Sequence, residues 1–380
     1  MHIVQIANFF GPTSGGLRVA LLELRARYLQ SGHRVTTIVP GATDTEVRVG
    51  RDTIITRRSP TLPASGGYRV LVRRSPISAL LGELCPDLIE LSDKSTLHWV
   101  PAWARSRSVP CVLFSHERTD AVLAGRVPRV VSLVPLVDRW NARMVRNVDL
   151  IVGASCFAIE EYLRIDHPRI VRVPLGFEAS VFRPDARGPA APRWPEGPVQ
   201  LVSVGRFSRE KDPTLAVETM RSLHERGVAA HLAMSGDGPM RSRLERRAGQ
   251  LDITFAGHLH DRHELARLVA SADVVLAPGP AETFGLAALE ALACGTPLVV
   301  PERGALAELV GTGCGIVTSS DGPSFASAVM SLLAGRRAEQ RNAAVRHAAR
   351  YSWDAAATRL LGEYRTLVVG DRPSRRVAPG

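Results

Sequence analysis

Short apolar runs alternate with longer amphipathic stretches along most of the chain. The runs are rich in valine and isoleucine, and each has the length of a strand. A strand, an amphipathic helix and a further strand in succession are typical of β-α-β units on a parallel sheet. In the first half, we predict strands at His2–Ala7, Arg34–Val39, Asp87–Leu91, Cys111–Ser115 and Leu150–Ala154, and a helix at Leu17–Ser31.

The alternation stops at 178–198, where prolines and glycines crowd together and predict a linker. It then resumes, so we predict an α/β protein with two Rossmann-like, doubly wound parallel-sheet domains that face a cleft. The strands predicted in the second half are Val199–Val204, Ala230–Ser235, Ile253–Ala256, Val274–Ala277 and Leu298–Val300. The predicted divisions are a first domain at 1–178, a linker at 179–198, a second domain at 199–352, a C-terminal helix at 353–370 and a disordered tail at 371–380.

Length and composition agree with this division. A chain of 380 residues is too long for one ordinary core, which favours two domains. No apolar run approaches the roughly 18 to 20 residues that span a bilayer. The start of the chain lacks the basic and cleavable apolar parts of a secretory signal and predicts a buried strand instead. We therefore expect a cytoplasmic protein.

The net charge and the spacing of possible metal-binding residues limit what the protein could bind. The net charge of +11 indicates an anionic partner, which could be a phosphate-bearing substrate, an acidic lipid surface or nucleic acid. The five cysteines are scattered without a C-x-x-C spacing, and there is no D-x-D element. The cluster of His258, His260, Asp261 and His263 matches no standard site, so we predict no bound metal.

Two cations follow the strand that opens the second half. Arg206 and Lys211 are five positions apart, just beyond the carboxyl end of this strand, where they could neutralise a leaving diphosphate. An ordinary solvated loop is the alternative. Glycines follow two other strands: Gly15 and Gly16 after the first one, and Gly236 after Ala230–Ser235. Each would let a nucleotide or sugar approach the backbone, or would simply form a tight turn.

The segment from Glu282 to Glu290 is the most informative one. It joins a strand and a Pro/Gly loop to a helix, so Glu282 lies at or before the helix start and Glu290 lies inside it. The amides near Phe284, Gly285 and Leu286 would face a diphosphate, and the two carboxylates would accept hydrogen bonds from sugar and ribose hydroxyls. Eight helical residues separate the α-carbons by about 12 Å, whereas retaining hydrolases need carboxyl groups about 5 Å apart. A hydrolytic carboxylate pair is therefore disfavoured.

Other candidates carry weaker signals. His116 follows the strand Cys111–Ser115 and would face the cleft, although a lone histidine is more often structural. Arg69, Arg73 and Arg74 adjoin an apolar stretch at 77–81, and a second basic segment runs from 126 to 146 with Arg129, Arg139 and Arg143. Either segment could lie on an acidic membrane surface. A core helix with a solvated basic face is the alternative.

Taken together, these residues resemble the GT-B glycosyltransferases of family 4 over essentially the whole chain, with the E-x7-E element Glu282 to Glu290 as the specific part. The resemblance implies that Glu282 contacts the donor sugar, that Glu290 contacts the nucleotide ribose, and that Arg206 and Lys211 hold the diphosphate. It also implies that His116 binds the donor sugar near the reacting carbon. By the same resemblance, Gly15 and Gly16 would approach the diphosphate and acceptor, and Asp261 would read the nucleobase.

Several short segments look more narrowly like the GDP-mannose-dependent phosphatidylinositol mannoside α-mannosyltransferases of the PimC type. These segments are Asn8–Phe9, Ser14–Arg18, Gly66–Arg69, Ser115–Arg118 and Ala277–Pro280. The resemblance implies a GDP-mannose donor, an anionic lipid acceptor and peripheral contact with the inner face of the cell membrane, without a metal cofactor and without nucleic acid. We expect the acceptor or the membrane to contact Arg18, Tyr68, Arg69, Arg73, Arg74 and Arg118.

The predicted reaction is a retaining hexosyl transfer, catalysed by His116, Arg206, Lys211 and Glu282. Positioning and electrostatics would supply the rate. No nucleophile is evident, so retention would follow from attack on the same face, with a leaving-phosphate oxygen taking the acceptor proton. Three alternatives stay open: a UDP-sugar donor with a soluble acceptor, a nucleotide-sugar epimerase of the same shape, and a non-enzymatic membrane or nucleic-acid binder. The sequence predicts neither the linkage formed nor an oligomeric state.

Overall fold

The computed structural model describes residues 1–11, 15–62, 67–124, 133–187 and 196–370. In this part of the chain, the first domain contains a sheet of eight strands in the order β3-β4-β2-β1-β5-β6-β7-β8. All neighbouring strands are parallel except β3, which is antiparallel to β4. The strands are β1 His2–Ile6, β2 Arg34–Gly41, β3 Thr45–Val49, β4 Asp52–Arg58, β5 Leu88–Leu91, β6 Cys111–Ser115, β7 Leu150–Gly153 and β8 Ile170–Arg172. The helices are α1 Gly16–Gln30, α2 Arg74–Leu84, α3 Val100–Ser106, α4 Thr119–Ala124, α5 Val134–Met144 and α6 Cys156–Leu163, with a 3-10 turn at Pro184–Ala186.

The second domain contains a parallel sheet of six strands among the described residues, in the order β11-β10-β9-β12-β13-β14. Its strands are β9 Val199–Val204, β10 Ala230–Ser235, β11 Ile253–Gly257, β12 Val274–Leu276, β13 Leu298–Pro301 and β14 Gly315–Thr318. Its helices are α7 Pro213–Glu225, α8 Arg241–Ala248, α9 Arg262–Ser271, α10 Leu286–Ala293, α11 Leu306–Leu309, α12 Gly322–Ala334 and α13 Arg337–Ala348, with a 3-10 turn at Arg209–Lys211, and α14 Trp353–Val369 ends the described chain.

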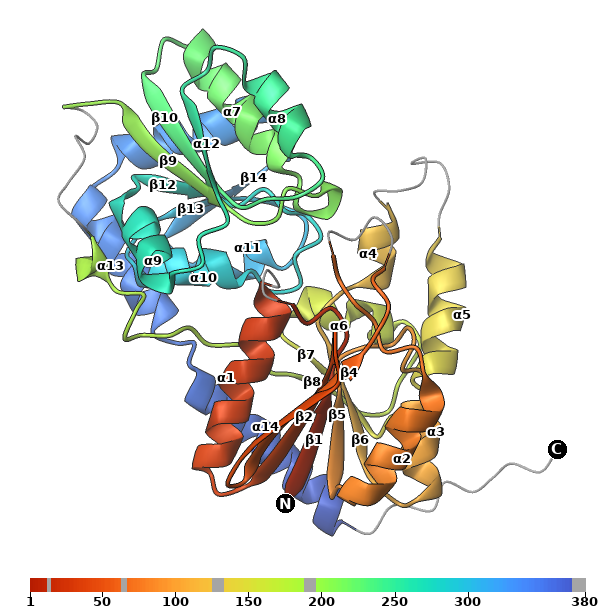
Figure 1. Cartoon of the computed structure of the whole chain (residues 1–380). Coiled ribbons are helices and arrows are strands. Elements are labelled where there is room, and N and C mark those ends of the chain that lie inside the picture. The colour runs from red at the N-terminus through yellow and green to blue at the C-terminus, as the bar shows by residue number, and fades with distance from the viewer. Residues whose placement is uncertain (12–14, 63–66, 125–132, 188–195, 371–380) are drawn as a thin grey trace.

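Both sheets are covered by helices on both faces, which explains why their central strands are largely apolar. In β1, Ile3 packs in the same cluster as residues of α1 and α14, whereas its neighbour Val4 packs with residues of α2 and α3. Successive side chains of a strand point to opposite faces, so a strand covered on both faces is buried at every position and mostly apolar. Figure 1 shows α1 and α14 on one side of the first sheet and α2 and α3 on the other. The two Rossmann-like domains predicted from the sequence are confirmed.

The last helix, α14, returns to the first domain. Its residue Tyr364 donates a hydrogen bond of 2.6 Å to the buried carboxylate of Glu90 on β5, and Tyr28 on α1 donates one of 2.9 Å to the same group. Gln5 on β1 adds a third donor at 2.8 Å. Burial of Glu90 raises its pKa. The C-terminal helix therefore completes a layer of the first domain although it follows the second one in sequence.

The strands that sequence patterns did not predict lie mostly at or near sheet edges. All five residues of β3 are exposed, so this edge strand lacks an apolar signal. The other missed strands are β4, β8 and β14, and the last two are edge strands as well. The predicted domain boundaries stay predictions. The tail at 371–380, the middle of the predicted linker at 188–195 and Arg129 lie outside the described residues.

Candidate active site

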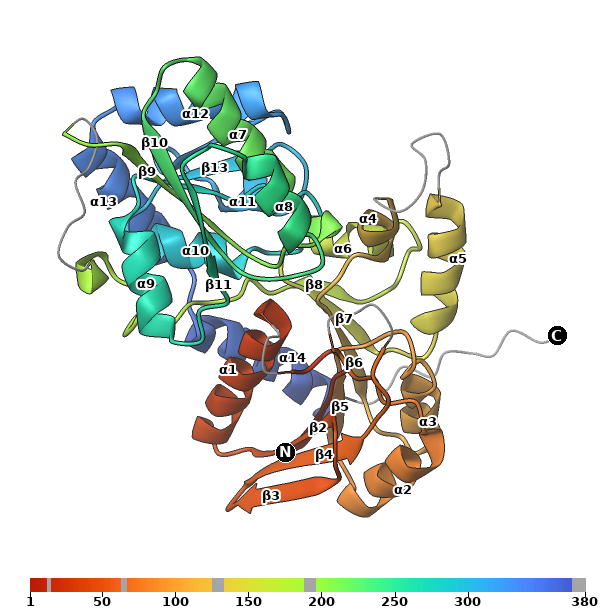
Figure 2. The ribbon, with the colours of Figure 1, turned by 45° about the horizontal axis from the view of Figure 1, so that its top comes forward.

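The candidate site lies on the second domain, where the loops after β9 and β12 meet at the carboxyl ends of their strands. These two loops line a pocket beside the first turn of α10. The two loops pack closely at Gly279, where a Cβ would lie 3.2 Å from Cγ of Glu282 and 3.5 Å from Cα of Lys211. The predicted residues that line the pocket are Arg206, Lys211, Glu282 and Gly285. Figure 2 shows this edge of the second domain turned toward the first domain.

Lys211 and Glu282 form an ion pair on the wall of the pocket. The Lys211 Nζ lies 2.5 Å from the Glu282 Oε1, and the two side chains are 31% and 26% exposed. Both groups are therefore within reach of a ligand in the pocket. The pair gives the site a cation for phosphate oxygens and a carboxylate for hydroxyl groups in direct contact.

Arg206 connects the pocket to the first domain. Its guanidinium lies over the ring of Tyr68, 4.4 Å from the ring centroid, in a cation–π contact. Partial burial lowers the pKa of Arg206, although arginine stays charged at any physiological pH. Tyr68 also meets Phe9 edge to face at 5.9 Å. A residue predicted to bind the donor diphosphate thus touches one predicted to bind the acceptor.

His116 approaches the same place from the end of β6. Its ring stacks on Phe114 with the centroids 4.5 Å apart, and its Nε2 lies 3.3 Å from the Oγ of Ser92. Burial lowers the pKa of His116 to about 4, so the imidazole is neutral at physiological pH. The Oγ1 of Thr283, the residue after Glu282, donates a hydrogen bond of 2.7 Å to the His116 carbonyl oxygen. A neutral ring in a fixed orientation can orient a substrate hydroxyl.

The starts of α10 and α1 converge at the domain interface. Gly285, just before α10, has φ +93°, and a Cβ there would lie 2.4 Å from Cδ2 of Leu306, so this turn requires glycine. A Cβ at Gly16 would lie 3.6 Å from Cδ1 of Leu286, which places the first turns of the two helices side by side. Both helix N-termini offer free amides to an anion. Gly15 is exposed directly before α1.

Two predicted donor residues have a clear structural role. The Phe284 side chain is buried and meets Tyr351 edge to face at 6.0 Å, so only its backbone could contact a ligand. A Cβ at Gly236 (φ +148°) would lie 1.9 Å from the carbonyl oxygen of Gly205. Tight packing of the loops after β9 and β10 therefore accounts for this glycine without a ligand.

Asp261 also has a structural role. Its carboxylate caps α9 and accepts a hydrogen bond of 2.8 Å from the amide of His263. The side chain is exposed at the end of β11. The capping contact explains Asp261 locally, and its proposed contact with the nucleobase stays a prediction.

Glu290 lies inside α10, as predicted, but it is buried. Its carboxylate accepts a hydrogen bond of 3.1 Å from Arg262, and the same guanidinium lies 3.3 Å from Glu178. Burial raises the pKa of Glu290 to about 7, against a lowering effect of Arg262. Sequence reasoning missed Arg262 as the partner of Glu290. The only signal was its place next to Asp261 in a polar cluster.

Four of the predicted acceptor arginines divide into two groups. Arg69 and Arg73 line a groove of about 860 Å³ on the first domain, together with Arg57 and Arg58. Arg69 also donates a hydrogen bond of 2.6 Å to the carbonyl oxygen of Ser59 at the bottom of the groove. The remaining arginines rest on aromatic rings: Arg74 on Trp99 at 5.1 Å and Arg18 on Phe10 at 5.6 Å.

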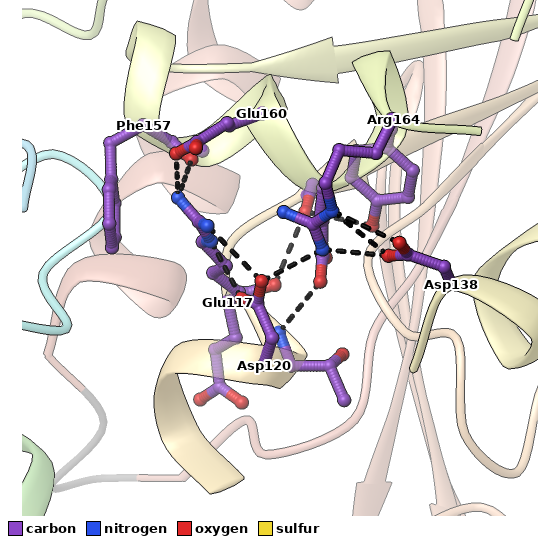
Figure 3. A network of polar contacts seen from close by, with 12 residues as sticks. Glu117, Asp120, Asp138, Phe157, Glu160 and Arg164 are labelled. Atoms are coloured by element: carbon purple, nitrogen blue, oxygen red, sulfur yellow. Dashed lines mark hydrogen bonds and ion pairs between the residues drawn. The ribbon is translucent and has the colours of Figure 1, made fainter. Parts of the chain in front are cut away.

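Arg118 lies in a buried ion-pair network, and its predicted contact with the acceptor stays a prediction. Its side chain is only 10% exposed, and its Nε donates a hydrogen bond of 2.6 Å to Asp120. It also pairs with Glu160 and lies over the ring of Phe157. Figure 3 shows this network, in which Arg164 binds Asp120 as well. The guanidinium of Arg118 is already used to join α4 to α6.

The described residues contain no helix long and apolar enough to cross a bilayer. Across the same ranges, no three His, Cys, Asp or Glu side chains are grouped as metal ligands would be. The second basic segment contributes α5, where Leu136 and Trp140 are 67% and 45% exposed beside the exposed Arg139 and Arg143.

Comparisons with known proteins give the family. The model of the Glycosyl transferase 4-like domain matches residues 15–176, and that of Glycosyl transferases group 1 matches residues 187–351. The fold resembles sucrose-phosphate synthase from Thermosynechococcus elongatus with a TM-score of 0.77 and 21% identity, over 97% of this chain and 100% of that one. Fold and site thus define a glycosyltransferase of the GT-B type.

The sequence comparison is more specific. The chain is 41% identical, over 98% of both chains, to the GDP-mannose-dependent alpha-(1-6)-phosphatidylinositol dimannoside mannosyltransferase of Mycobacterium tuberculosis. It is 27% identical to the GDP-mannose-dependent alpha-mannosyltransferase of Corynebacterium glutamicum, over 97% of this chain and 89% of that one. The chain therefore belongs to the family 4 glycosyltransferases, and the family recognised from the E-x7-E element is confirmed.

Proposed function

We propose that this chain transfers mannose from GDP-mannose to a phosphatidylinositol mannoside, with retention of the anomeric configuration. The observation that carries the proposal is the meeting of Lys211, Glu282 and Arg206 in one pocket, with His116 joined to the same loop from the other domain. The names of the two relatives above support GDP-mannose as the donor, and that of the mycobacterial enzyme supports the lipid acceptor.

In this mechanism, the protein supplies charge and orientation. Arg206, Lys211 and the first amides of α10 stabilise the negative charge that builds up on the departing diphosphate. Because cations of the chain neutralise that charge, we propose that no metal cofactor is needed. Glu282 accepts hydrogen bonds from sugar hydroxyls, and the neutral His116 orients the sugar near its anomeric carbon. The bond from that carbon to the diphosphate breaks while the bond to the acceptor oxygen forms on the same face, and the acceptor proton passes to a leaving-phosphate oxygen.

The basic groove on the first domain supports an anionic acceptor. Arg57, Arg58 and Arg73 offer cations to a phosphate, while Leu71 and Ile77 line the same groove with apolar surface. Tyr68 directly precedes Arg69 of the groove and touches Arg206 of the pocket. A lipid headgroup in the groove would therefore lie next to the donor site.

The outer face of α5 supports peripheral membrane contact. The exposed Leu136 and Trp140 are one helical turn apart, and so are the exposed Arg139 and Arg143. The only acidic residue of the helix, Asp138, is paired with Arg164. Basic groups near an acidic membrane contribute about 1 kcal/mol each, and apolar side chains add burial at the interface.

The test of the transferase is mannosyl transfer by Lys211→Ala and Glu282→Ala variants with GDP-mannose and a phosphatidylinositol dimannoside. We expect turnover to fall by about 100- to 1,000-fold in each, as for lost transition-state contacts. The matched controls are alanine variants of Arg336 and Glu339, an exposed ion pair on the surface of the same domain with the Nη1 and Oε1 atoms 2.8 Å apart. Near wild-type turnover in both pocket variants would refute the assignment.

A donor screen separates the alternatives. Thermal stability is measured with GDP-mannose, UDP-glucose and UDP-N-acetylglucosamine, since a ligand that binds the folded form stabilises it. We expect only GDP-mannose to raise the melting temperature. Stabilisation by a UDP-sugar would redirect the donor assignment, and conversion of free nucleotide sugar without an acceptor would indicate an epimerase. Binding to vesicles with acidic lipids, lost in the Leu136→Ser and Trp140→Ser variants, tests the membrane contact on α5.

A further inference from the structure

Thr283 makes two hydrogen bonds to the first domain, although it lies in the catalytic loop of the second. Its Oγ1 donates to the carbonyl oxygen of His116 at 2.7 Å, and its own carbonyl oxygen accepts a hydrogen bond of 2.6 Å from the Oγ of Ser155. His116 follows β6 and Ser155 follows β7, which are neighbouring strands. One residue therefore fixes the loop of Glu282 against two strand ends of the other domain.

Ser155 has a second role in the same contact. Its Oγ accepts a hydrogen bond of 2.9 Å from the amide of Ala158 and so caps α6. The first two amides of this helix, those of Cys156 and Phe157, donate to the carboxylate of Glu308 at 2.9 Å each. Glu308 lies on α11 of the second domain, so a carboxylate from one domain satisfies the helix start of the other.

The two contacts are joined within the second domain. The amide of Ala305, directly before α11, donates a hydrogen bond of 3.1 Å to the carbonyl oxygen of Glu282. Glu308 is additionally 3.6 Å from the guanidinium of Arg172 at the end of β8. Each of three segments, the loop of Glu282, the start of α11 and the start of α6, therefore contacts the other two. We call Thr283, Ser155 and Glu308 the interdomain junction.

We propose that Thr283 and Glu308 are positioning residues, which align His116 with Glu282 only when the second domain is seated on α6. This inference rests on the proposed function, because it takes His116 and Glu282 to contact the same donor sugar. Neither positioning side chain is needed to hold the diphosphate, since Arg206 and Lys211 lie on a different loop. Loss of the junction should therefore impair the chemical step more than donor binding. Misplacement by about 1 Å can reduce a rate by about 100-fold.

The first experiment measures kcat and KM for GDP-mannose in a Thr283→Val variant. We expect kcat to fall about 10- to 100-fold with KM changed less than about threefold, and a Thr283→Ser variant to recover most of the loss because it keeps the hydroxyl. The matched control is Thr219→Val. Thr219 is buried in α7 and donates a hydrogen bond of 2.8 Å to the carbonyl oxygen of Leu215, so the variant loses a similar bond away from the junction. Equal losses of kcat in the Thr283→Val and Thr219→Val variants would overturn the inference.

The second experiment does not depend on activity. Small-angle X-ray scattering of the full chain compares the radius of gyration of the wild type with that of a Thr283→Val, Glu308→Ala double variant. We expect a larger radius in the double variant, because the two domains separate when the junction is lost. An unchanged radius together with unchanged kcat would refute the positioning role. If the wild type transfers no mannose but the radius of the double variant increases, the proposed donor or acceptor is wrong and the junction stands.

Discussion

Replacing Glu290 by glutamine should stabilise the protein at neutral pH while weakening donor binding. Glu290 is 7% exposed, and burial raises its pKa to about 7 from an ordinary value of 4.5. At about 1.4 kcal/mol per pH unit, this difference corresponds to about 3 kcal/mol of destabilisation once the carboxylate is charged. Glutamine has nearly the same shape and carries no charge, so it avoids that cost. Its amide oxygen can still accept a hydrogen bond from Arg262.

The direction of the pH dependence follows from the protons bound by each state. Between about pH 4.5 and pH 7, the folded form keeps the Glu290 proton and the unfolded form loses it, so the contribution of this group to stability falls as the pH rises. Below that window, both forms of the wild type are neutral at Glu290 and resemble the glutamine variant. The advantage of Glu290→Gln should therefore grow from nearly zero at pH 4.5 to about 3 kcal/mol above pH 7.

Urea denaturation at pH 5 and at pH 8 measures this difference, with Glu339→Gln as the control. The side chain of Glu339 is 68% exposed, so its substitution should leave the pH dependence unchanged. Calorimetric titration with GDP-mannose tests the second half of the prediction. We expect binding to weaken about tenfold, since Glu290 is predicted to accept hydrogen bonds from the ribose hydroxyls and the variant loses its charge. Parallel stability profiles of the wild type and Glu290→Gln across this pH range would refute the reasoning about burial.

Two further predictions concern His116 and Tyr364. Burial lowers the pKa of His116 to about 4, so NMR should show no titration of its ring above pH 5. The group should reduce the free energy of unfolding only as the pH falls from 6.5 toward 4, because the unfolded form then binds a proton that the folded form does not. An inflection of the ring signals near pH 6.5 would contradict this. A Tyr364→Phe variant removes a hydrogen bond of 2.6 Å to the buried Glu90 and should lower the free energy of unfolding by about 1.5 to 3 kcal/mol. Urea denaturation measures the loss, and an unchanged midpoint and slope would show that α14 contributes little through this bond.

The sequence predicts the parts of this fold that local patterns determine. Strands such as β1 and β6 are buried on both faces, so most of their residues are apolar and the strand is visible in the sequence. Strand β3 carries no such signal, because every one of its residues faces solvent and its place depends on pairing with β4. The return of α14 to the first domain likewise depends on contacts between residues far apart in the chain.

In the site, too, local patterns predict some residues, whereas the roles of others depend on distant partners. Lys211 and Glu282 follow strand ends of one domain, and a parallel sheet brings its strand ends together, so their meeting follows from local reasoning. The roles of Arg118 and Thr283 depend on partners that no spacing indicates. Arg118 resembles a surface cation in sequence, yet two carboxylates and a ring enclose it.

The E-x7-E spacing groups two carboxylates that the structure places in different electrostatic environments. Glu282 is partly exposed and paired with a lysine of the pocket, whereas Glu290, on α10, is buried and paired with Arg262. A ligand can therefore reach Glu282 directly, but a charged Glu290 is stable only if hydrogen-bond donors compensate for its burial. The ribose hydroxyls of the nucleotide, which the sequence predicts as partners of Glu290, are such donors. Donor binding should therefore lower the pKa of Glu290 and release a proton near pH 7. Calorimetric titrations in buffers with different ionisation enthalpies would detect that proton, and Glu290→Gln should abolish its release.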